Sequence, residues 1–358
     1  MSKSTLGDYG YERFAAELPT IDMEEFVPGR VIAQHKGGYR IVTEFGEYIA
    51  QVTGKYQYEL GEQGGYPAVG DFVKVQIPES NDRAMIHGLL PRKTMFYRKD
   101  NWNSSGLQIL ASNFDTVFIC MSLNKDFNLS RLERFLIMAE ESRAERAIVL
   151  TKADLCDDVE GRVAICRAIA ADIPVYAVSS AQRKGLEWLL PYFEKGKTVV
   201  ALGSSGVGKS SLVNALFGDQ RMETSEIRAD DDKGRHTTVH REIIILPSGG
   251  LYMDTPGIRE IGLVDAAESV AHRFDDVEQL LIRCKYKDCQ HRQEPGCAVQ
   301  AAIRSGELSN DRFKKYLQFQ KEAAFSESKS GYLFDKWQLS KAHSRNLKEI
   351  RKHSRKRK

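Results

Sequence analysis

The chain has 358 residues, of which 42% are hydrophobic and 28% charged, an ordinary composition for a globular protein with room for two or three domains. No stretch approaches the roughly 18 consecutive apolar residues of a membrane span, and the first residues lack a signal peptide's apolar core. We therefore expect a cytoplasmic protein. The net charge of +3 is uneven, because residues 341–358 hold nine Lys or Arg against one Glu. Such a basic tail indicates contact with nucleic acid, although a merely solvated tail has the same composition.

Residues 1–28 mix acidic and aromatic side chains without a clear period, which predicts a mobile or loosely packed N-terminal arm. Five short runs rich in β-branched residues follow, separated by glycines, and predict strands at residues 29–35, 39–45, 47–53, 71–77 and 83–87. Five strands so close together predict a small β-barrel over residues 29–95, with the OB-fold as the favoured topology. Many such barrels bind nucleic acid, but the fold alone supports no function.

Residues 92–114 form a basic, polar connector, after which strands and helices alternate. Strands are predicted at residues 115–123, 146–150, 173–178 and 197–202, with helices between them. This alternation is typical of a parallel sheet with helices on both faces. Two further strands, at 242–247 and 251–254, are predicted to form a hairpin, so that an α/β domain spans residues 110–265. Residues 268–340 are helical and charged, and predict a third domain before the tail.

The strand at 197–202 leads into a match to the phosphate-binding loop pattern, and a helical pattern follows it, as that loop requires. The loop reads Gly203, Ser204, Ser205, Gly206, Val207, Gly208, Lys209 and Ser210. Backbone N–H groups of such a loop surround phosphate oxygens at a helix N-terminus. We expect Lys209 to neutralise the terminal phosphates during catalysis, Ser210 to bind Mg²⁺, and Ser211 to complete the nucleotide contacts.

Three more motifs fit a guanine-nucleotide site. Asp254-Thr-Pro-Gly257 follows a strand, where phosphate-loop NTPases place a carboxylate for the Mg²⁺ shell and a glycine N–H for the γ-phosphate. Thr151-Lys152-Ala153-Asp154 resembles the GTPase base motif, whose carboxylate accepts from guanine N1–H and the exocyclic amine. Adenine offers no such donor pair, which disfavours an adenine-nucleotide enzyme. Ser179 and Ser180 lie in a stretch that resembles the motif contacting guanine O6 through its backbone.

The order of these motifs is unusual. In ordinary GTPases the base motifs follow the phosphate loop, whereas here they precede it. A parallel sheet can be cut and rejoined without changing which strand ends face the ligand, because ligands bind along the carboxyl edge. The sequence therefore predicts a circularly permuted P-loop GTPase domain.

The polar stretch at residues 221–241 lies where GTPases have their first switch. Ile258 follows Gly257 where many GTPases carry a glutamine that orients the attacking water, and Ile258 has no polar atom. We predict that His236 orients this water instead, since imidazole can accept a proton from it. Thr237 or Thr238 is expected to complete the Mg²⁺ shell, a choice that the sequence leaves open; our assignment is Thr238.

A cluster of soft ligands lies in the predicted third domain. Cys284, Cys289, His291 and Cys297 fall within fourteen residues, which suits a closed, tetrahedral Zn²⁺ site with a structural role. Arg283, Lys285, Lys287 and Arg292 surround the cluster, and suggest that it faces a phosphate backbone.

With these motifs assembled, the chain resembles the ribosome small-subunit-dependent GTPase A family over nearly its whole length. The resemblance implies an N-terminal OB-fold barrel, a permuted GTPase domain and a C-terminal helical zinc-binding domain. It also implies a late assembly factor of the small ribosomal subunit that binds rRNA and whose GTP hydrolysis the subunit stimulates. GTP or GDP with Mg²⁺, one structural zinc and a monomeric state are expected. The alternative is an RNA-binding scaffold with a passive guanine-nucleotide switch.

One residue departs from the commoner form of the family. Thr151 stands where an Asn is usual, and this removes an amide that stabilises the base site. The change predicts that guanine preference survives through Asp154 but that nucleotide affinity is modest.

Overall fold

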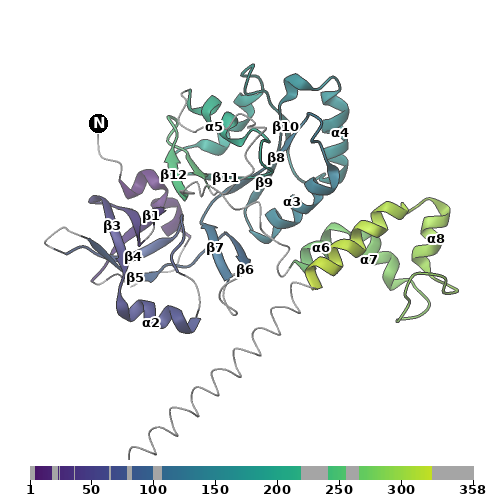
Figure 1. Cartoon of the computed structure of the whole chain (residues 1–358), viewed down its shortest axis with the longest axis horizontal. Helices are drawn as coiled ribbons and strands as arrows, with labels where there is room; N and C mark the ends of the chain where they lie inside the picture. Colours follow the sequence, from purple (N-terminus) through teal and green to yellow (C-terminus); the bar gives the residue numbers. More distant parts are fainter. Residues whose placement is uncertain are drawn as a thin grey trace, which may run out of the picture. The chain divides into compact units, whose positions relative to one another are not determined.

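The computed structural model describes residues 5–17, 23, 25–35, 37–63, 66–78, 83–99, 107–218, 241–254 and 266–324 (Figure 1). The chain divides into two compact units. The first consists of Met1–Tyr97 and Gln108–Ile261, and the second of Arg98–Leu107 and Gly262–Lys358. None of the described helices has the length and apolar character needed to cross a membrane.

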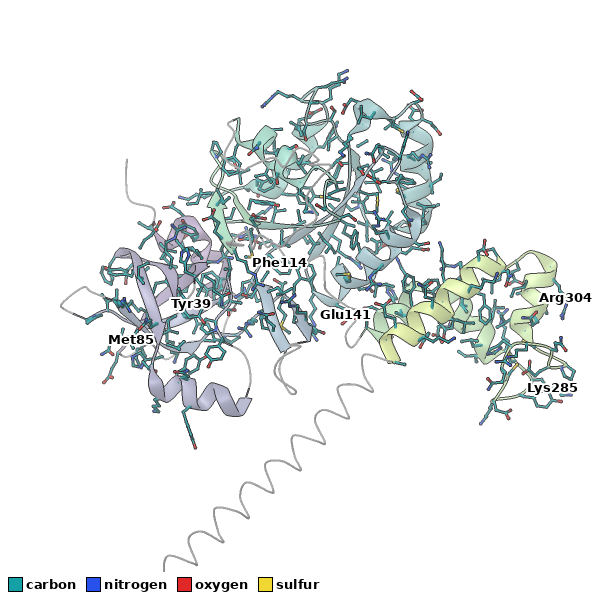
Figure 2. All side chains as sticks on the ribbon, viewed as in Figure 1. Tyr39, Met85, Phe114, Glu141, Lys285 and Arg304 are labelled. Carbon is teal, nitrogen blue, oxygen red and sulfur yellow. The ribbon has the colours of Figure 1, made fainter. Side chains whose placement is uncertain are left out.

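The first unit begins with a closed five-stranded barrel, which confirms the predicted OB-fold. Its strands are β1 (Val27–His35), β2 (Gly38–Thr43), β3 (Gly46–Val52), β4 (Phe72–Gln76) and β5 (Ala84–Leu89). They lie in the order β1-β2-β3-β5-β4, and pairing of β1 with β4 closes the barrel. Alternate residues such as Val31, Ile41 and Tyr39, the last labelled in Figure 2, fill its core. A helix that the sequence did not predict, α2 (Gly54–Gln63), connects β3 to β4.

The N-terminal arm packs against the barrel, so the prediction of a mobile or loosely packed arm is wrong for its described part. A short 3₁₀ helix, η1 (Leu6–Tyr9), and one helical turn, α1 (Tyr11–Ala15), bury Leu6, Tyr9 and Phe14. The Phe14 ring stacks on Phe72 of the barrel, with ring centroids 4.0 Å apart. These helices are too short to produce a periodic pattern, which is why the sequence did not reveal them.

A mostly parallel sheet follows the barrel and confirms the predicted α/β domain. Its strands are β8 (Thr116–Ser122), β9 (Glu145–Thr151), β10 (Val175–Ala177), β11 (Thr198–Leu202), β12 (Arg241–Ile245) and β13 (Leu251–Asp254). They lie in the order β10-β9-β8-β11-β13-β12, and only β12, the outer strand of the predicted hairpin, is antiparallel to its neighbour. Fully buried runs such as β8 and β11 are typical of parallel strands covered on both faces.

Helices join these strands and complete the core. They are α3 (Leu129–Glu141), the 3₁₀ turn η2 (Ala153–Leu155), α4 (Val159–Ile169), the 3₁₀ helix η3 (Leu186–Phe193) and α5 (Lys209–Phe217). On one face of the sheet, Leu212 of α5 and Leu189 of η3 share a buried cluster with Phe118 and Val199. The helix after the phosphate loop is therefore fixed to the sheet that carries the loop.

Two features of the join between barrel and sheet were not predicted. Strand β1 pairs antiparallel with β12, which makes the barrel and the α/β sheet one continuous 11-stranded sheet. The connector, predicted only as polar, forms a two-stranded sheet of β6 (Met95–Lys99) and β7 (Leu107–Ser112). Neither pairing follows from a residue pattern, because both depend on where the folded barrel comes to lie.

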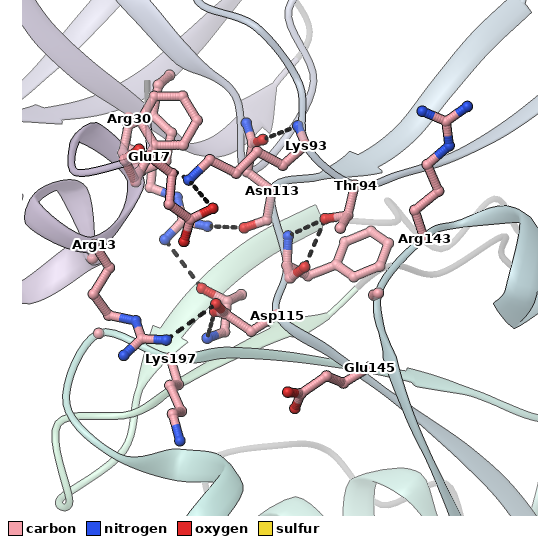
Figure 3. A pocket seen from close by; sticks show the side chains of 17 residues that line it. Arg13, Glu17, Arg30, Lys93, Thr94, Asn113, Asp115, Arg143, Glu145 and Lys197 are labelled. Atoms are coloured by element: carbon pink, nitrogen blue, oxygen red, sulfur yellow. Dashed lines mark hydrogen bonds and ion pairs between the residues drawn. The ribbon is translucent and has the colours of Figure 1, made fainter. Parts of the chain in front are cut away.

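A buried arginine lies at the same join (Figure 3). The Arg30 guanidinium of β1 donates to the carbonyls of Tyr9 at 2.6 Å and Asn113 at 2.7 Å, and to the Thr198 hydroxyl at 3.1 Å. These partners belong to the arm, the connector and the strand that leads to the phosphate loop. Burial lowers the pKa of Arg30 to about 10, which leaves the side chain charged at neutral pH.

The second unit is helical. Its described helices are α6 (Ala267–Arg273), α7 (Asp275–Ile282) and α8 (Ala298–Ser305), and a further helical segment covers residues 310–324. Phe274 is fully buried and packs its ring against Tyr316 and Phe319 of that segment. Arg312 donates twice to the Asp276 carboxylate, at 2.5 and 2.7 Å, which connects the segment to α7.

Candidate nucleotide-binding site

The phosphate loop connects the end of β11 at Leu202 to the start of α5 at Lys209. Gly206 and Gly208 have φ angles of 69° and 102°, in the left-handed region that favours glycine. A Cβ at Gly203 would lie 2.7 Å from the Cys120 carbonyl oxygen, so this glycine is required by close packing on β8. The loop thus has the backbone conformation that the sequence motif demands.

The Lys209 side chain folds back over its own loop. Its Nζ donates to the carbonyls of Gly203 at 2.7 Å and Ser204 at 2.9 Å. The ammonium group therefore lies within the curve of the phosphate loop, beside the α5 N-terminus, where positive charge favours anions.

The base motif follows β9 and contacts the phosphate loop directly. Thr151 is 2% exposed, and its hydroxyl donates to the Val207 carbonyl. Lys152 has a φ of 57°, and its Nζ donates to the Gly206 carbonyl at 2.7 Å. Two adjacent residues of the base motif thus bind two adjacent positions of the phosphate loop, although 54 or more residues separate them in sequence.

These contacts revise the interpretation of Thr151. We expected the loss of an asparagine amide to weaken the base site. In the structure the threonine hydroxyl itself donates to the Val207 carbonyl of the phosphate loop, a contact that the sequence did not predict. The expectation of modest affinity remains a prediction.

The two predicted base motifs are joined by a hydrogen bond between side chains. The Ser179 hydroxyl donates to Asp154 Oδ1 at 2.5 Å and accepts from the Gln182 N–H at 3.0 Å. Ser179 is 2% exposed and exchanges two backbone hydrogen bonds with Lys184, which closes a tight loop after β10. Sequence reasoning missed Gln182 and Lys184, because the loop has no period that would show its closure.

Asp254 lies at the carboxyl end of β13, the strand next to β11. In the parallel pairing Val200 of β11 lies opposite Met253 of β13. Asp254 is the next residue, so it lies at the same edge of the sheet as the end of β11, where the phosphate loop begins. Gly257, Ile258, His236, Thr237 and Thr238 lie outside the described residues, and their roles remain predictions.

The predicted metal ligands come together in the second unit. One ligand atom from each of Cys284, Cys289, His291 and Cys297 lies within 4.8 Å of the others. His291 Nδ1 is 3.5 Å from Cys284 Sγ and 3.6 Å from Cys297 Sγ. The Gln300 amide donates to the His291 carbonyl at 2.7 Å and so fixes the turn that carries the imidazole. Three sulfurs and one nitrogen this close together fit a tetrahedral metal site.

Comparison with known proteins agrees with this geometry. The family model described as RsgA GTPase matches residues 89–264. Over 297 residues the chain is 43% identical to the small ribosomal subunit biogenesis GTPase RsgA 2 of Lactiplantibacillus plantarum, an alignment that covers 83% of each protein. The chain belongs to the RsgA GTPase family.

Other RsgA proteins and solved structures support the same assignment. The small ribosomal subunit biogenesis GTPase RsgA of Opitutus terrae is 41% identical over 332 residues, 90% of each chain. Among solved structures, YjeQ from Thermotoga maritima has a TM-score of 0.59 and 26% identity, over 83% of this chain and 98% of its own. YloQ, described as a circularly permuted GTPase, has a TM-score of 0.54 and 25% identity, over 85% and 97%. The predicted permuted order of the RsgA-type domain is thereby confirmed.

Proposed function

We propose that this chain hydrolyses GTP and acts as an assembly factor of the small ribosomal subunit. The observation that carries the proposal is the direct contact of the base motif with the phosphate loop, through Thr151 and Lys152. This contact brings the two motifs together in one site, although the base motif precedes the phosphate loop in sequence, the reverse of the order in ordinary GTPases. The RsgA relatives, named as small ribosomal subunit biogenesis GTPases, support the choice of partner.

The chain's own residues account for nucleotide binding. Backbone N–H groups from Gly203 to Ser210 bind the phosphates at the N-terminus of α5. Lys209 exchanges its two carbonyl acceptors for phosphate oxygens. The Ser179 hydroxyl orients the Asp154 carboxylate, which accepts from the guanine N1–H and amine and so selects guanine over adenine.

Catalysis is assigned to residues around the γ-phosphate. When bound, Mg²⁺ neutralises charge that develops on the phosphates. Ser210 and Thr238 are proposed as its ligands, with Asp254 in the surrounding shell and the Gly257 N–H on the γ-phosphate. His236 is proposed to orient the attacking water, because Ile258 cannot do so.

The remaining assignments concern the partner. We assign one structural Zn²⁺ to the Cys₃His cluster, because thiolates and an imidazole suit zinc in a closed site. Contact with rRNA is assigned to three parts of the chain: the barrel, the Lys and Arg side chains next to the Cys₃His cluster, and the basic tail at residues 341–358. We expect the protein to act as a monomer in the cytoplasm, where subunits assemble.

The test is GTP hydrolysis by the purified chain with and without purified small ribosomal subunits. We expect slow turnover alone and a large increase with subunits. The Lys209→Ala and Ser210→Ala variants should be inactive in both conditions, because they lose phosphate neutralisation and a Mg²⁺ ligand. GTP binding without turnover in either condition would instead support a passive switch on an RNA-binding scaffold.

A further inference from the structure

One row of residues crosses the join between the barrel and the nucleotide-binding sheet. Ala33 of β1 lies opposite Arg40 of β2 on one side and opposite Glu242 of β12 on the other. Glu242 in turn lies opposite Asp254 of β13, the carboxylate assigned to the Mg²⁺ shell. Residues directly opposite each other in antiparallel strands project to the same face. Arg40, Glu242 and Asp254 therefore share one face of the continuous sheet.

The barrel supplies the positive charge in this row. Arg40 Nη2 lies 3.4 Å from Glu242 Oε2, so the arginine reaches across the small side chain of Ala33. Ala33 is only 1% exposed, which is consistent with its being covered. Glu47 of β3 is a second, weaker partner of Arg40 at 3.9 Å, and it lies outside the row.

The acidic end of the row has an electrostatic cost. Glu242 and Asp254 carry like charges at directly opposed positions, where Cβ atoms are about 4.5–5.5 Å apart and repulsion destabilises the strand pair. The Arg40 guanidinium offsets the charge of Glu242 and thereby reduces its effect on Asp254. A residue of the barrel thus sets the charge beside a nucleotide-site carboxylate on another domain.

We propose that Arg40 and Glu242 are positioning residues for Asp254, and that the barrel controls the Mg²⁺ dependence of nucleotide binding through this pair. The proposal rests on the proposed function only in assigning Asp254 to the Mg²⁺ shell. Neither residue belongs to the phosphate loop or the base motifs, and both act through the electrostatic potential at Asp254. Because the pair is partly exposed, at 36% for Arg40 and 43% for Glu242, the effect is moderate and depends on salt.

The test is the rate of GDP dissociation from the full-length chain, measured over a range of Mg²⁺ concentrations. Arg40→Ala leaves Glu242 uncompensated, so the added negative charge should lower the Mg²⁺ concentration for half-maximal GDP retention by roughly two- to fivefold. Glu242→Gln removes the nearer of the two carboxylates that pair with Arg40, and the resulting gain in positive charge should raise this Mg²⁺ concentration by a similar factor. The double variant restores the parental charge and should return close to the parental value.

Matched control variants distinguish an electrostatic effect of Arg40 and Glu242 from a purely structural one. Arg40→Lys keeps the charge, and Glu47→Gln removes the carboxylate outside the row; both should keep the parental Mg²⁺ dependence. A merely structural role would move both single variants in the same direction and the double variant further still. That result, or no shift in either single variant, would overturn the proposal. Absence of GTP hydrolysis in a parent that retains GDP in a Mg²⁺-dependent way would count against the proposed function alone.

Discussion

The hydroxyl of Thr151 donates a hydrogen bond to the backbone carbonyl of Val207, which connects the end of β9 to the phosphate loop after β11. Both groups are buried, with Thr151 2% and Val207 4% exposed. Gly208 follows Val207 with a φ of 102°, a conformation that side chains rarely adopt, and a Cβ there would make only an ordinary 3.6 Å contact with the Thr151 oxygen, so the backbone conformation rather than lack of space requires glycine. The base half and the phosphate half of the site therefore depend on each other.

Replacing Thr151 by Val should weaken GDP binding by about tenfold, because the isosteric side chain leaves the Val207 carbonyl without its donor, a loss of about 1–2 kcal/mol. Thr151→Ser keeps the hydroxyl and should bind nearly as well as the parent. Equilibrium titration with a fluorescent GDP analogue measures both. Equal affinity of all three proteins would show that the hydrogen bond contributes nothing to the site.

Base selection should depend on Asp154. Asp154→Asn should weaken GTP binding and favour xanthosine triphosphate, because the amide donates to the xanthine oxygen where the carboxylate accepted from an amine. Ser179→Ala removes the hydroxyl that orients Asp154, so it should weaken GTP without changing the preferred base. Competition between the two nucleotides distinguishes these outcomes. Unchanged GTP affinity in Asp154→Asn would mean that this motif is only a turn.

The site motifs were predictable from sequence because each consists of adjacent residues whose spacing has a chemical reason. Gly206, Gly208 and Lys209 satisfy the phosphate loop pattern, and the order of motifs predicted the permutation. Contacts between the motifs were not predictable. That Thr151 reaches Val207, or that Ser179 reaches Asp154, depends on how β9, β10 and β11 are arranged in the folded sheet.

The fold was predictable where a segment has its own period and less so where it depends on a neighbour. The barrel strands are runs of β-branched residues separated by glycines, whereas the short helices of the arm show no pattern and are fixed by packing, as Phe14 on Phe72 illustrates. The β1–β12 pairing has no local signal either, since Ala33 and Glu242 become neighbours only after both domains form.

Removal of the metal should unfold the second unit and leave the fold of the first unit intact. Chelation, or Cys289→Ser, should unfold the helices around the Cys₃His cluster, because a structural metal contributes folding free energy directly. Nucleotide binding by the first unit should persist. Cys156→Ser, outside the cluster, is the matched control and should keep both properties. Metal analysis and circular dichroism provide the measurements, and native protein without zinc would contradict the assignment.

The catalytic role of His236 is tested by His236→Ala. Loss of a water-orienting group should reduce subunit-stimulated turnover by ~10²-fold or more, with GTP affinity little changed. Arg235→Ala is the neighbouring control and should reduce turnover less, because arginine can stabilise charge but cannot accept a proton from water. Equal stimulation of His236→Ala and the parent would assign the catalytic group to another residue or to the ribosomal subunit.

Arg30 should be the residue on which the join between arm, barrel and nucleotide-binding sheet depends most. Arg30→Met keeps an unbranched apolar stem of similar shape but removes the guanidinium, which leaves the carbonyls of Tyr9 and Asn113 and the hydroxyl of Thr198 without their shared donor. Unsatisfied buried acceptors cost about 1–3 kcal/mol each, and this cost is partly offset because the variant buries no charge. We therefore expect a loss of about 2–5 kcal/mol in the free energy of unfolding.

Arg13→Met is the matched control for Arg30→Met. The 3.8 Å ion pair of Arg13 with Asp115 is half-exposed and should contribute less than about 1 kcal/mol to the free energy of unfolding. Urea unfolding of the full-length chain measures both, and limited proteolysis should show the arm cleaved faster only in Arg30→Met. Equal stability of the two variants would mean that packing of Phe14 on Phe72, rather than the guanidinium, determines the position of the arm.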